Sequence, residues 1–237
     1  MTTVTASPTT ARERVAQLAR QQVSVLQRGY LTDEAKAVAA LARLRRGAGR
    51  AAGQLPDLWD LVDAGPLHDP MEGARALSES EVIRAQDALH VALTLFAFHQ
   101  QSRSTGMHQP DRREARRGLG AAVRRMMQSG EVDEPLRKRL VRAGTAPDLS
   151  TLAQRLRDIV TLLRREDIAL DYGLLAGQLF TWQRPGGADV VRQEWGRSFH
   201  AWHDRKPDDK QFAADAVAAN AGTADSTSPS DTDKDVS

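Results

Sequence analysis

Two histidines, His99 and His108, stand nine residues apart where an apolar helix pattern gives way to polar residues, in the stretch TLFAFHQQSRSTGMHQ. Imidazole is a common zinc ligand and a general acid or base. A second pair, His200 and His203, has an i,i+3 spacing that is compatible with a metal, but the pattern supplies no third ligand and no HExxH sequence occurs. We therefore predict no metal site, and we expect His99 and His108 to shape the polar end of a buried helix and the turn after it.

Other catalytic patterns are missing from the sequence. It has no cysteine, which excludes disulfides, thiolate zinc sites and cysteine nucleophiles. No G-x-S-x-G elbow, P-loop or GxGxxG stretch occurs. Carboxylates such as Asp57, Asp60 and Glu166 have the positions of helix caps and exposed faces. We predict that the protein is not an enzyme and uses no cofactor.

The charge of the chain is unevenly distributed. The whole sequence carries 33 Lys and Arg against 31 Asp and Glu, a formal net charge of +2. Residues 103–165 carry 15 basic against 7 acidic side chains, and nearly all of the bases are arginines. Solvated helices usually pair the two signs, whereas arginine suits bidentate phosphate contacts and stacking on unpaired bases. This central stretch therefore predicts a polyanionic partner.

Nearly every segment between the termini has the apolar periodicity of a helix, and none shows the period-two alternation of a strand. Ser78 and Glu81 form a capping-box pattern before a run that is apolar almost all round, in which His90 is expected to be a core residue. We predict an all-α bundle of about eight helices. The expected helices cover residues 11–28, 32–44, 56–62, 81–101, 111–128, 135–142, 150–165, 171–182 and 190–203.

The bundle should occupy residues 11–203 and could divide into two packed lobes, 11–110 and 111–203. Residues 1–10 and 204–237 are poor in large apolar side chains, so both termini are predicted to be disordered. The second of these segments is acidic and could be a passive solubiliser, or it could lie over the basic stretch and compete with a ligand. No signal-peptide pattern or long apolar run occurs, so we expect a cytoplasmic protein without membrane contact.

A helical projection shows which basic side chains lie outside the core. In the predicted helix 111–128, three arginines lie opposite the apolar face, and residues 135–142 carry four bases with almost no acidic neighbours. Two more arginines lie beside each other on the flank of the predicted helix 150–165. We predict that these side chains bind nucleic acid. They are Arg113, Arg117, Arg124, Arg137, Lys138, Arg139, Arg142, Arg157 and Arg164.

Several longer stretches carry a family pattern. They occur in order between about residue 36 and residue 199, and they are ALARLRRGAG, PDLWDLV, ALHVALTLFAFHQQSRSTGMH, GLGAAV, PLRKRLVRAGTAPDLSTLAQRLRDIVTLLRRE, LDYGLLAGQLFTWQ and VRQEWGRSF. Together they resemble the CasB family, the small subunit of the type I-E CRISPR Cascade complex.

The resemblance implies a non-catalytic helical subunit that forms a head-to-tail pair with a second copy of itself. It also implies contacts with the backbone and large subunits of Cascade, with crRNA, and with the target and displaced DNA strands of the R-loop. The Arg-rich run 111–117 and the acidic tail depart from the family pattern, so the path of the strand does not follow from the resemblance. The basic residues that match the family's motifs are Arg45, Arg46, Lys138, Arg139, Arg142, Arg155 and Arg157.

Two other functions stay open at the level of sequence. The first is a helix-turn-helix DNA-binding regulator built from 135–142 and 150–165, although the linking segment AGTAPDLS is longer than the usual turn of about three or four residues. The second is a protein scaffold whose arginines bind acidic surfaces of its partners. Sequence-specific duplex binding would favour the regulator, and competition by nucleic acid would argue against the scaffold.

Overall fold

The protein folds as eight α-helices joined by loops and short 3₁₀ turns, and no strand occurs within the described residues, which are 10–68, 75–127 and 132–201 of a computed structural model. The predicted all-α bundle of about eight helices is thus confirmed. Disorder was predicted for residues 1–10 and 204–237, and all of these except Thr10 lie outside the described residues. Thr10 is ordered as the N-cap of α1. The division into lobes at residue 110 stays a prediction. The α-helices are α1 (Ala11–Leu31), α2 (Ala35–Leu44), α3 (Glu79–Gln100), α4 (Leu119–Arg125), α5 (Glu134–Gly144), α6 (Leu149–Arg165), α7 (Tyr172–Trp182) and α8 (Gly187–His200).

Four 3₁₀ turns lie between α2 and α3, where the sequence indicated only one short helix at 56–62. Glycine and proline interrupt this segment repeatedly, so it forms single turns instead of a continuous helix. No helix of the described part is both long and apolar enough to span a membrane. The turns are η1 (Arg45–Gly47), η2 (Ala52–Gln54), η3 (Pro56–Leu58) and η4 (Gly65–Leu67).

Helix α3 begins at the predicted capping box. The Ser78 hydroxyl accepts a hydrogen bond from the backbone N–H of Glu81, and the Glu81 carboxylate accepts one from the backbone N–H of Ser78 at 2.9 Å. Arg75 also donates to this carboxylate, and together these bonds lower the pKa of Glu81 to about 2. The start of α3 is therefore fixed by local chemistry that is visible in the sequence.

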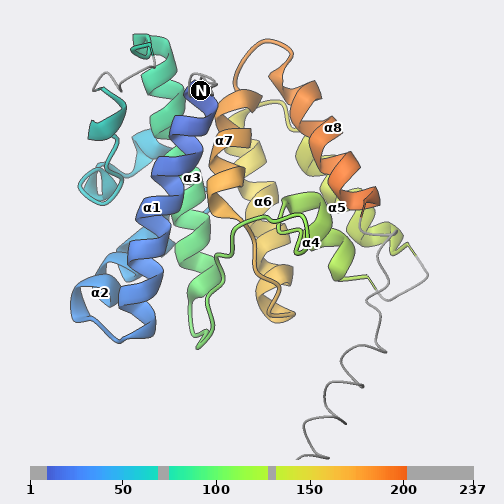
Figure 1. The fold of residues 1–237 in the computed structure, drawn as a ribbon, viewed down its shortest axis with the longest axis horizontal. Coiled ribbons are helices and arrows are strands. Elements are labelled where there is room, and N and C mark those ends of the chain that lie inside the picture. The colour runs from blue at the N-terminus through green and yellow to red at the C-terminus, as the bar shows by residue number, and fades with distance from the viewer. Residues whose placement is uncertain (1–9, 69–74, 128–131, 202–237) are drawn as a thin grey trace, which may run out of the picture. The chain divides into compact units, whose positions relative to one another are not determined.

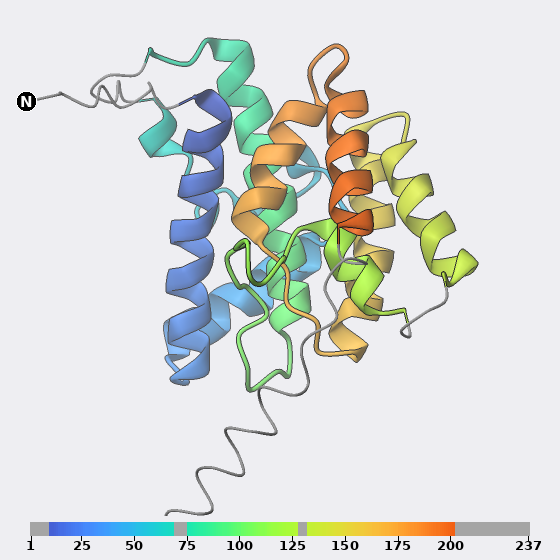
Figure 2. The same ribbon diagram turned by 45° about the vertical axis from the view of Figure 1, so that its right-hand side comes forward.

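The core forms around α3, whose residues from Ala88 to Ala97 are buried on every side. Figures 1 and 2 show α1 and α7 side by side along α3, and α3 also packs against α2 and α6. A helix that is apolar all round can only be accommodated in this way. On the other side of the bundle, α8 packs against α4, α5 and α7, and α5 lies along α6.

Gly120 allows α4 to approach α8 closely. A Cβ atom at this position would lie 2.0 Å from the carbonyl oxygen of Trp195, a distance that no side chain can tolerate. The buried indole of Trp195 donates from Nε1 to Gln178 Oε1 at 2.9 Å, which ties α8 to α7. The glycine in the stretch GLGAAV is therefore required by helix packing.

The predicted helix 111–128 is wrong in its first half. Residues 111–118 form a loop, and only α4, which ends at Arg125, is helical. The Asp111 carboxylate accepts hydrogen bonds from the backbone N–H groups of Arg117 and Gly118, which closes the loop on itself. The Asp111 backbone in turn donates to the buried carboxylate of Asp171 at 2.8 Å. Asp side chains compete with the helix for backbone donors in this way.

Candidate nucleic-acid interface

Helix α6 separates the predicted basic residues into two groups. Arg155 and Arg157 lie about 200° apart around the helix axis, on opposite flanks of its buried face. Arg155 points to α5, where its guanidinium donates to the carbonyl oxygen of Arg142. Arg157 points to the turn that follows α2. The helical projection selected Arg157 and Arg164 on one flank, and only the family resemblance selected Arg155. The sequence therefore did not show that the bases of α6 lie on two different surfaces.

The flank that carries Arg157 borders a groove of about 570 Å³, which we call the basic groove. Arg45 and Arg46 belong to η1, and Arg50 follows in the same turn. The groove therefore brings Arg45 and Arg46, which the family resemblance alone selected, beside Arg157, which the helical projection also selected. Only one acidic residue, Asp158, lines the groove among the described residues. The lining residues are Arg45, Arg46, Ala48, Gly49, Arg50, Gln154, Arg157 and Asp158.

Two contacts position Arg157. Its guanidinium carbon lies 5.0 Å from the centroid of the Phe98 ring, within the range of a cation–π interaction. Its Cδ atom lies 3.0 Å from the place where a Cβ of residue 49 would be. That residue is Gly49, which has a φ of +81° and so takes the left-handed turn at little cost. The aliphatic stem of Arg157 can therefore lie against the turn while its charged end lines the groove.

Arg164 lies about two turns further along α6 and contacts the same aromatic ring, with its guanidinium carbon 5.5 Å from the Phe98 centroid. Its Nε donates to the carbonyl oxygen of Gln101 at 3.1 Å. The pKa of Arg164 is lowered, first by burial and then by the positive charges of Arg103 and Arg45. This repulsion between like charges would be relieved by a bound anion, so the electrostatics favour a polyanion here.

Some of the positive charge is already paired within the protein. Arg46 forms an ion pair with Asp57 at 2.6 Å, and Arg103 pairs with Asp167 at 2.8 Å. Both pairs are at the surface, where such interactions are weak and exchange readily. Arg46 can therefore leave its weak ion pair with Asp57 and contact a phosphate instead.

The second group of bases, which we call the α5 group, consists of exposed side chains of α5 together with the partly exposed Arg155 of α6. Arg137 forms an ion pair with Glu134 at 2.8 Å, within the first turn of the helix. The Asp133 side chain accepts a hydrogen bond from the backbone N–H of Leu136 and fixes the helix start. The members of the α5 group are Arg137, Lys138, Arg139, Arg142 and Arg155.

The three arginines of the predicted helix 111–128 do not lie as the helical projection indicated. Arg113 is exposed, but it belongs to the loop and not to a helix. Arg117 is partly buried, and burial lowers its pKa. Arg124 is only 4% exposed, so the prediction that it faces away from the core is wrong. α4 is buried on most of its surface because Gly120 brings it against α8.

The histidines of the opening stretch have structural roles. His99 is fully buried, and its Nδ1 lies 2.9 Å from the hydroxyl oxygen of Tyr172. His108 accepts a hydrogen bond at Nδ1 from the backbone N–H of the same tyrosine at 3.2 Å. Burial, together with the nearby positive charges of Arg103 and Arg164, lowers the pKa of His99 to about 3. His99 is therefore a neutral core residue at physiological pH.

The turn between the two histidines is held by side-chain amides. Gln100 Oε1 accepts from the backbone N–H of Met107 at 2.9 Å, and its Nε2 donates to the carbonyl oxygen of Thr105 at 2.9 Å. Gln27 of α1 binds both the N–H and the C=O of His108. No group of three or more His, Asp or Glu side chains in the described residues could hold a metal ion.

Arg50 is the groove residue that the sequence analysis missed. It follows a glycine-containing turn outside any predicted helix, so no helical projection includes it. Its carbonyl oxygen lies 3.2 Å from Nε2 of His90, which anchors the turn to α3. His90 is thus a hydrogen-bonded core residue, as predicted. The signal that could have revealed Arg50 is its place four residues after Arg46, in the sequence RRGAGR.

Comparisons with known proteins identify the family of this chain and relatives of its fold. The family model of the CRISPR-associated protein Cse2 matches residues 40–200. The crystal structure of CasB from Thermobifida fusca is 50% identical in sequence with a TM-score of 0.69, and the match covers 78% of this chain and 97% of that chain. A chain of a CRISPR RNA-guided surveillance complex is similar in fold, with a TM-score of 0.56 at 20% identity over 85% of this chain and 99% of that chain. No curated protein matched the sequence.

Proposed function

Since this chain belongs to the family of the CRISPR-associated protein Cse2, we propose that it is a non-catalytic small subunit of a type I-E CRISPR surveillance complex in the cytoplasm. Its basic surfaces would hold crRNA and the target and displaced DNA strands of the R-loop. Its protein partners would be the backbone and large subunits of Cascade and a second copy of the chain.

The observation that carries the proposal is the convergence of four arginines on the basic groove. Arg45, Arg46 and Arg50 come from one turn and Arg157 from a separate helix, and a single carboxylate of the described residues lines the groove beside them. Guanidinium groups bind phosphate oxygens in bidentate fashion and are held here on a rigid frame. Such a surface contacts the backbone of a nucleic acid without reading its sequence.

Weak contacts of this kind are sufficient for the proposed role. R-loop formation replaces a DNA duplex by an RNA–DNA hybrid of about the same stability, so the exchange is nearly balanced. A modest gain from backbone contacts to the displaced strand therefore shifts the equilibrium toward the open state. The protein need not recognise bases, because the guide RNA supplies the sequence specificity.

The structure changes the case against a helix-turn-helix regulator. α5 ends at Gly144 and α6 begins at Leu149, so the linker has four residues and its length does not exclude that motif. Two other findings disfavour a regulator: the chain belongs to the Cse2 family, and Arg157 lines the basic groove together with a turn outside this helix pair. A scaffold that binds acidic proteins stays the alternative for the α5 group.

The test is fluorescence anisotropy of labelled single-stranded DNA and RNA of mixed sequence, titrated with the full chain at several salt concentrations. The proposal predicts binding that is indifferent to sequence and weakens with salt, with log K falling by roughly 0.7 per neutralised phosphate for each tenfold rise in salt. Binding confined to one duplex sequence would instead identify a regulator. The absence of binding at low salt would leave the protein scaffold as the better account.

A further inference from the structure

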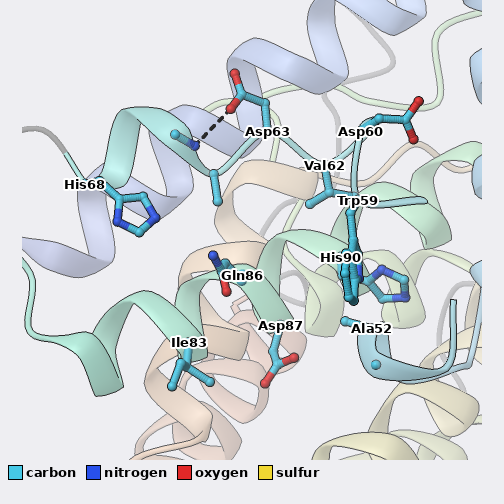
Figure 3. Close-up of a pocket in the computed structure, with 13 residues that line it drawn as sticks. Ala52, Trp59, Asp60, Val62, Asp63, His68, Ile83, Gln86, Asp87 and His90 are labelled. Atoms are coloured by element: carbon cyan, nitrogen blue, oxygen red, sulfur yellow. Dashed lines mark hydrogen bonds between the residues drawn. The ribbon is translucent and has the colours of Figure 1, made fainter. Parts of the chain in front are cut away.

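A pocket of about 810 Å³ lies between the first half of α3 and the segment that carries η2, η3 and η4. Figure 3 shows residues of α3, among them Ile83 and Asp87, on one wall, with Trp59 and Val62 on the other. The pocket and the basic groove share no lining residue, although both border the stretch of chain that follows α2. Gly49 and Arg50 line the groove, whereas Ala52 and Gly53 line the pocket.

The pocket presents large apolar side chains to solvent. Trp59 is 65% exposed and Ile83 is 53% exposed, one on each wall. Large exposed apolar side chains on both walls of one pocket are typical of contact sites for other proteins. The face of an indole ring is also the best aromatic partner for a guanidinium or ammonium group.

Among the described residues, the pocket also contains one carboxylate that has no partner. Asp60 is bound by both terminal nitrogens of Arg43, and Asp63 accepts a hydrogen bond from the backbone N–H of Gly65. Asp87 is partly buried, and within the described part of the chain it has no hydrogen-bond or ion-pair partner. Burial raises the pKa of Asp87, which shows that its negative charge is poorly solvated in this position. A cation placed beside it would remove this penalty.

We propose that this pocket binds an arginine or lysine side chain, flanked by an apolar residue, that a different partner protein presents. Asp87 would accept hydrogen bonds from the cation, Trp59 would cover its face, and Ile83 and Val62 would contact the apolar neighbour. Nucleic acid is disfavoured here because the carboxylates of Asp63 and Asp87, which no cation of the described residues pairs, repel phosphates.

The test uses ¹H–¹⁵N NMR of the full chain and follows the indole Nε1–H signal of Trp59, identified with a Trp59→Phe variant. The probe is the peptide acetyl-Leu-Arg-Leu-amide, and its control is the same peptide with citrulline, which has the shape of arginine without the charge. We expect a saturable shift with the arginine peptide and binding on the order of tenfold weaker with citrulline. The Asp87→Asn variant should bind the arginine peptide only as weakly as the unaltered protein binds the citrulline peptide.

Glu79→Gln provides the matched control, because it removes one exposed negative charge from the same helix without altering the pocket lining. It should leave the affinity unchanged. Asp87→Asn should keep a thermal midpoint at or above that of the unaltered protein, because burial disfavours the charge that it removes. Thermal melting therefore separates loss of binding from loss of fold.

Three results would overturn the proposal. Equal binding of both peptides would show that the pocket does not recognise the charge, and the lack of any shift would show that it does not bind this chemistry. A Trp59 signal that moves with protein concentration alone would identify a second copy as the occupant. None of these results would affect the nucleic-acid proposal, because Trp59 and Asp87 do not line the basic groove.

Discussion

The guanidinium carbon of Arg157 lies 5.0 Å from the ring centroid of Phe98, which joins the basic flank of α6 to the central helix α3. Arg164 lies over the same ring at 5.5 Å. One aromatic side chain at the edge of the core therefore orients two cations beside the basic groove. This arrangement reduces the number of conformations that the arginines must give up when they bind a phosphate.

Replacing Phe98 by leucine should weaken binding of single-stranded nucleic acid about two- to fivefold. The estimate follows from the loss of a cation–π interaction of about 0.5–1 kcal/mol, while leucine keeps most of the packing. Fluorescence anisotropy measures the change. Phe96→Leu makes the same chemical change on the same helix, where the ring contacts Tyr172 instead of an arginine, and should leave the affinity unaltered. Equal affinities of Phe98→Leu and the unaltered protein would show that the ring does not orient the arginines.

Removal of two guanidinium groups from the groove should weaken nucleic-acid binding more than Phe98→Leu does. The double variant Arg50→Ala/Arg157→Ala should weaken binding to all sequences alike and reduce the slope of log K against log salt by about 1.4, or roughly 0.7 per lost phosphate contact. The variant Arg184→Ala/Arg197→Ala removes the same charge from exposed positions outside the groove and should change the slope little.

A parallel measurement with Lys138→Ala/Arg139→Ala/Arg142→Ala assigns the α5 group. If this triple variant also reduces the salt slope, the α5 group contacts nucleic acid. An unchanged slope would assign it to a protein interface. Equal slopes for the groove variant and its charge-matched control would contradict the proposed role of the groove.

Local patterns were sufficient to predict most of the fold, but not the composition of the site. The capping box at Ser78 and the neighbouring positions of Arg157 and Arg164 follow from spacing along the chain alone. The failures at residues 111–118 and at Arg124 have tertiary causes. Asp111 takes the backbone donors that a helix would use, and α4 is buried against α8. No periodicity indicates that a turn after α2 will lie beside α6, so Arg50 was not predictable as a groove residue.

The buried His99 should make the stability of the protein depend on pH. Its pKa falls from the ordinary 6.5 to about 3 in the folded state, so between these values the unfolded chain binds more protons than the folded one. The free energy of unfolding therefore decreases as the pH falls below 6.5, and His99 should account for a loss of about 2 kcal/mol at pH 5. Urea unfolding at pH 7 and pH 5 measures this difference.

His99→Leu provides the control for the pH experiment. It removes the titrating group, so the difference in unfolding free energy between pH 7 and pH 5 should shrink by about the same 2 kcal/mol, even if the variant is less stable at both values. His90 and His108, whose pKa values are also lowered by burial, should account for part of the difference that is left. A variant with an unchanged pH difference would show that His99 takes up its proton without unfolding.

Gly120 on α4 and Gly196 on α8 should respond in opposite ways to substitution by alanine. In Gly120→Ala the new Cβ would lie 2.0 Å from the Trp195 carbonyl oxygen and 2.4 Å from Ser198 Oγ, so the helices must separate. We expect a loss of about 1–3 kcal/mol or more in the free energy of unfolding. Gly196→Ala, next to Trp195 on α8, meets no atom within 4 Å and should stabilise the protein by about 0.5–1 kcal/mol, since alanine restricts the unfolded chain. Urea unfolding of both variants measures the contrast, and similar stabilities would mean that α4 and α8 do not pack as closely as described.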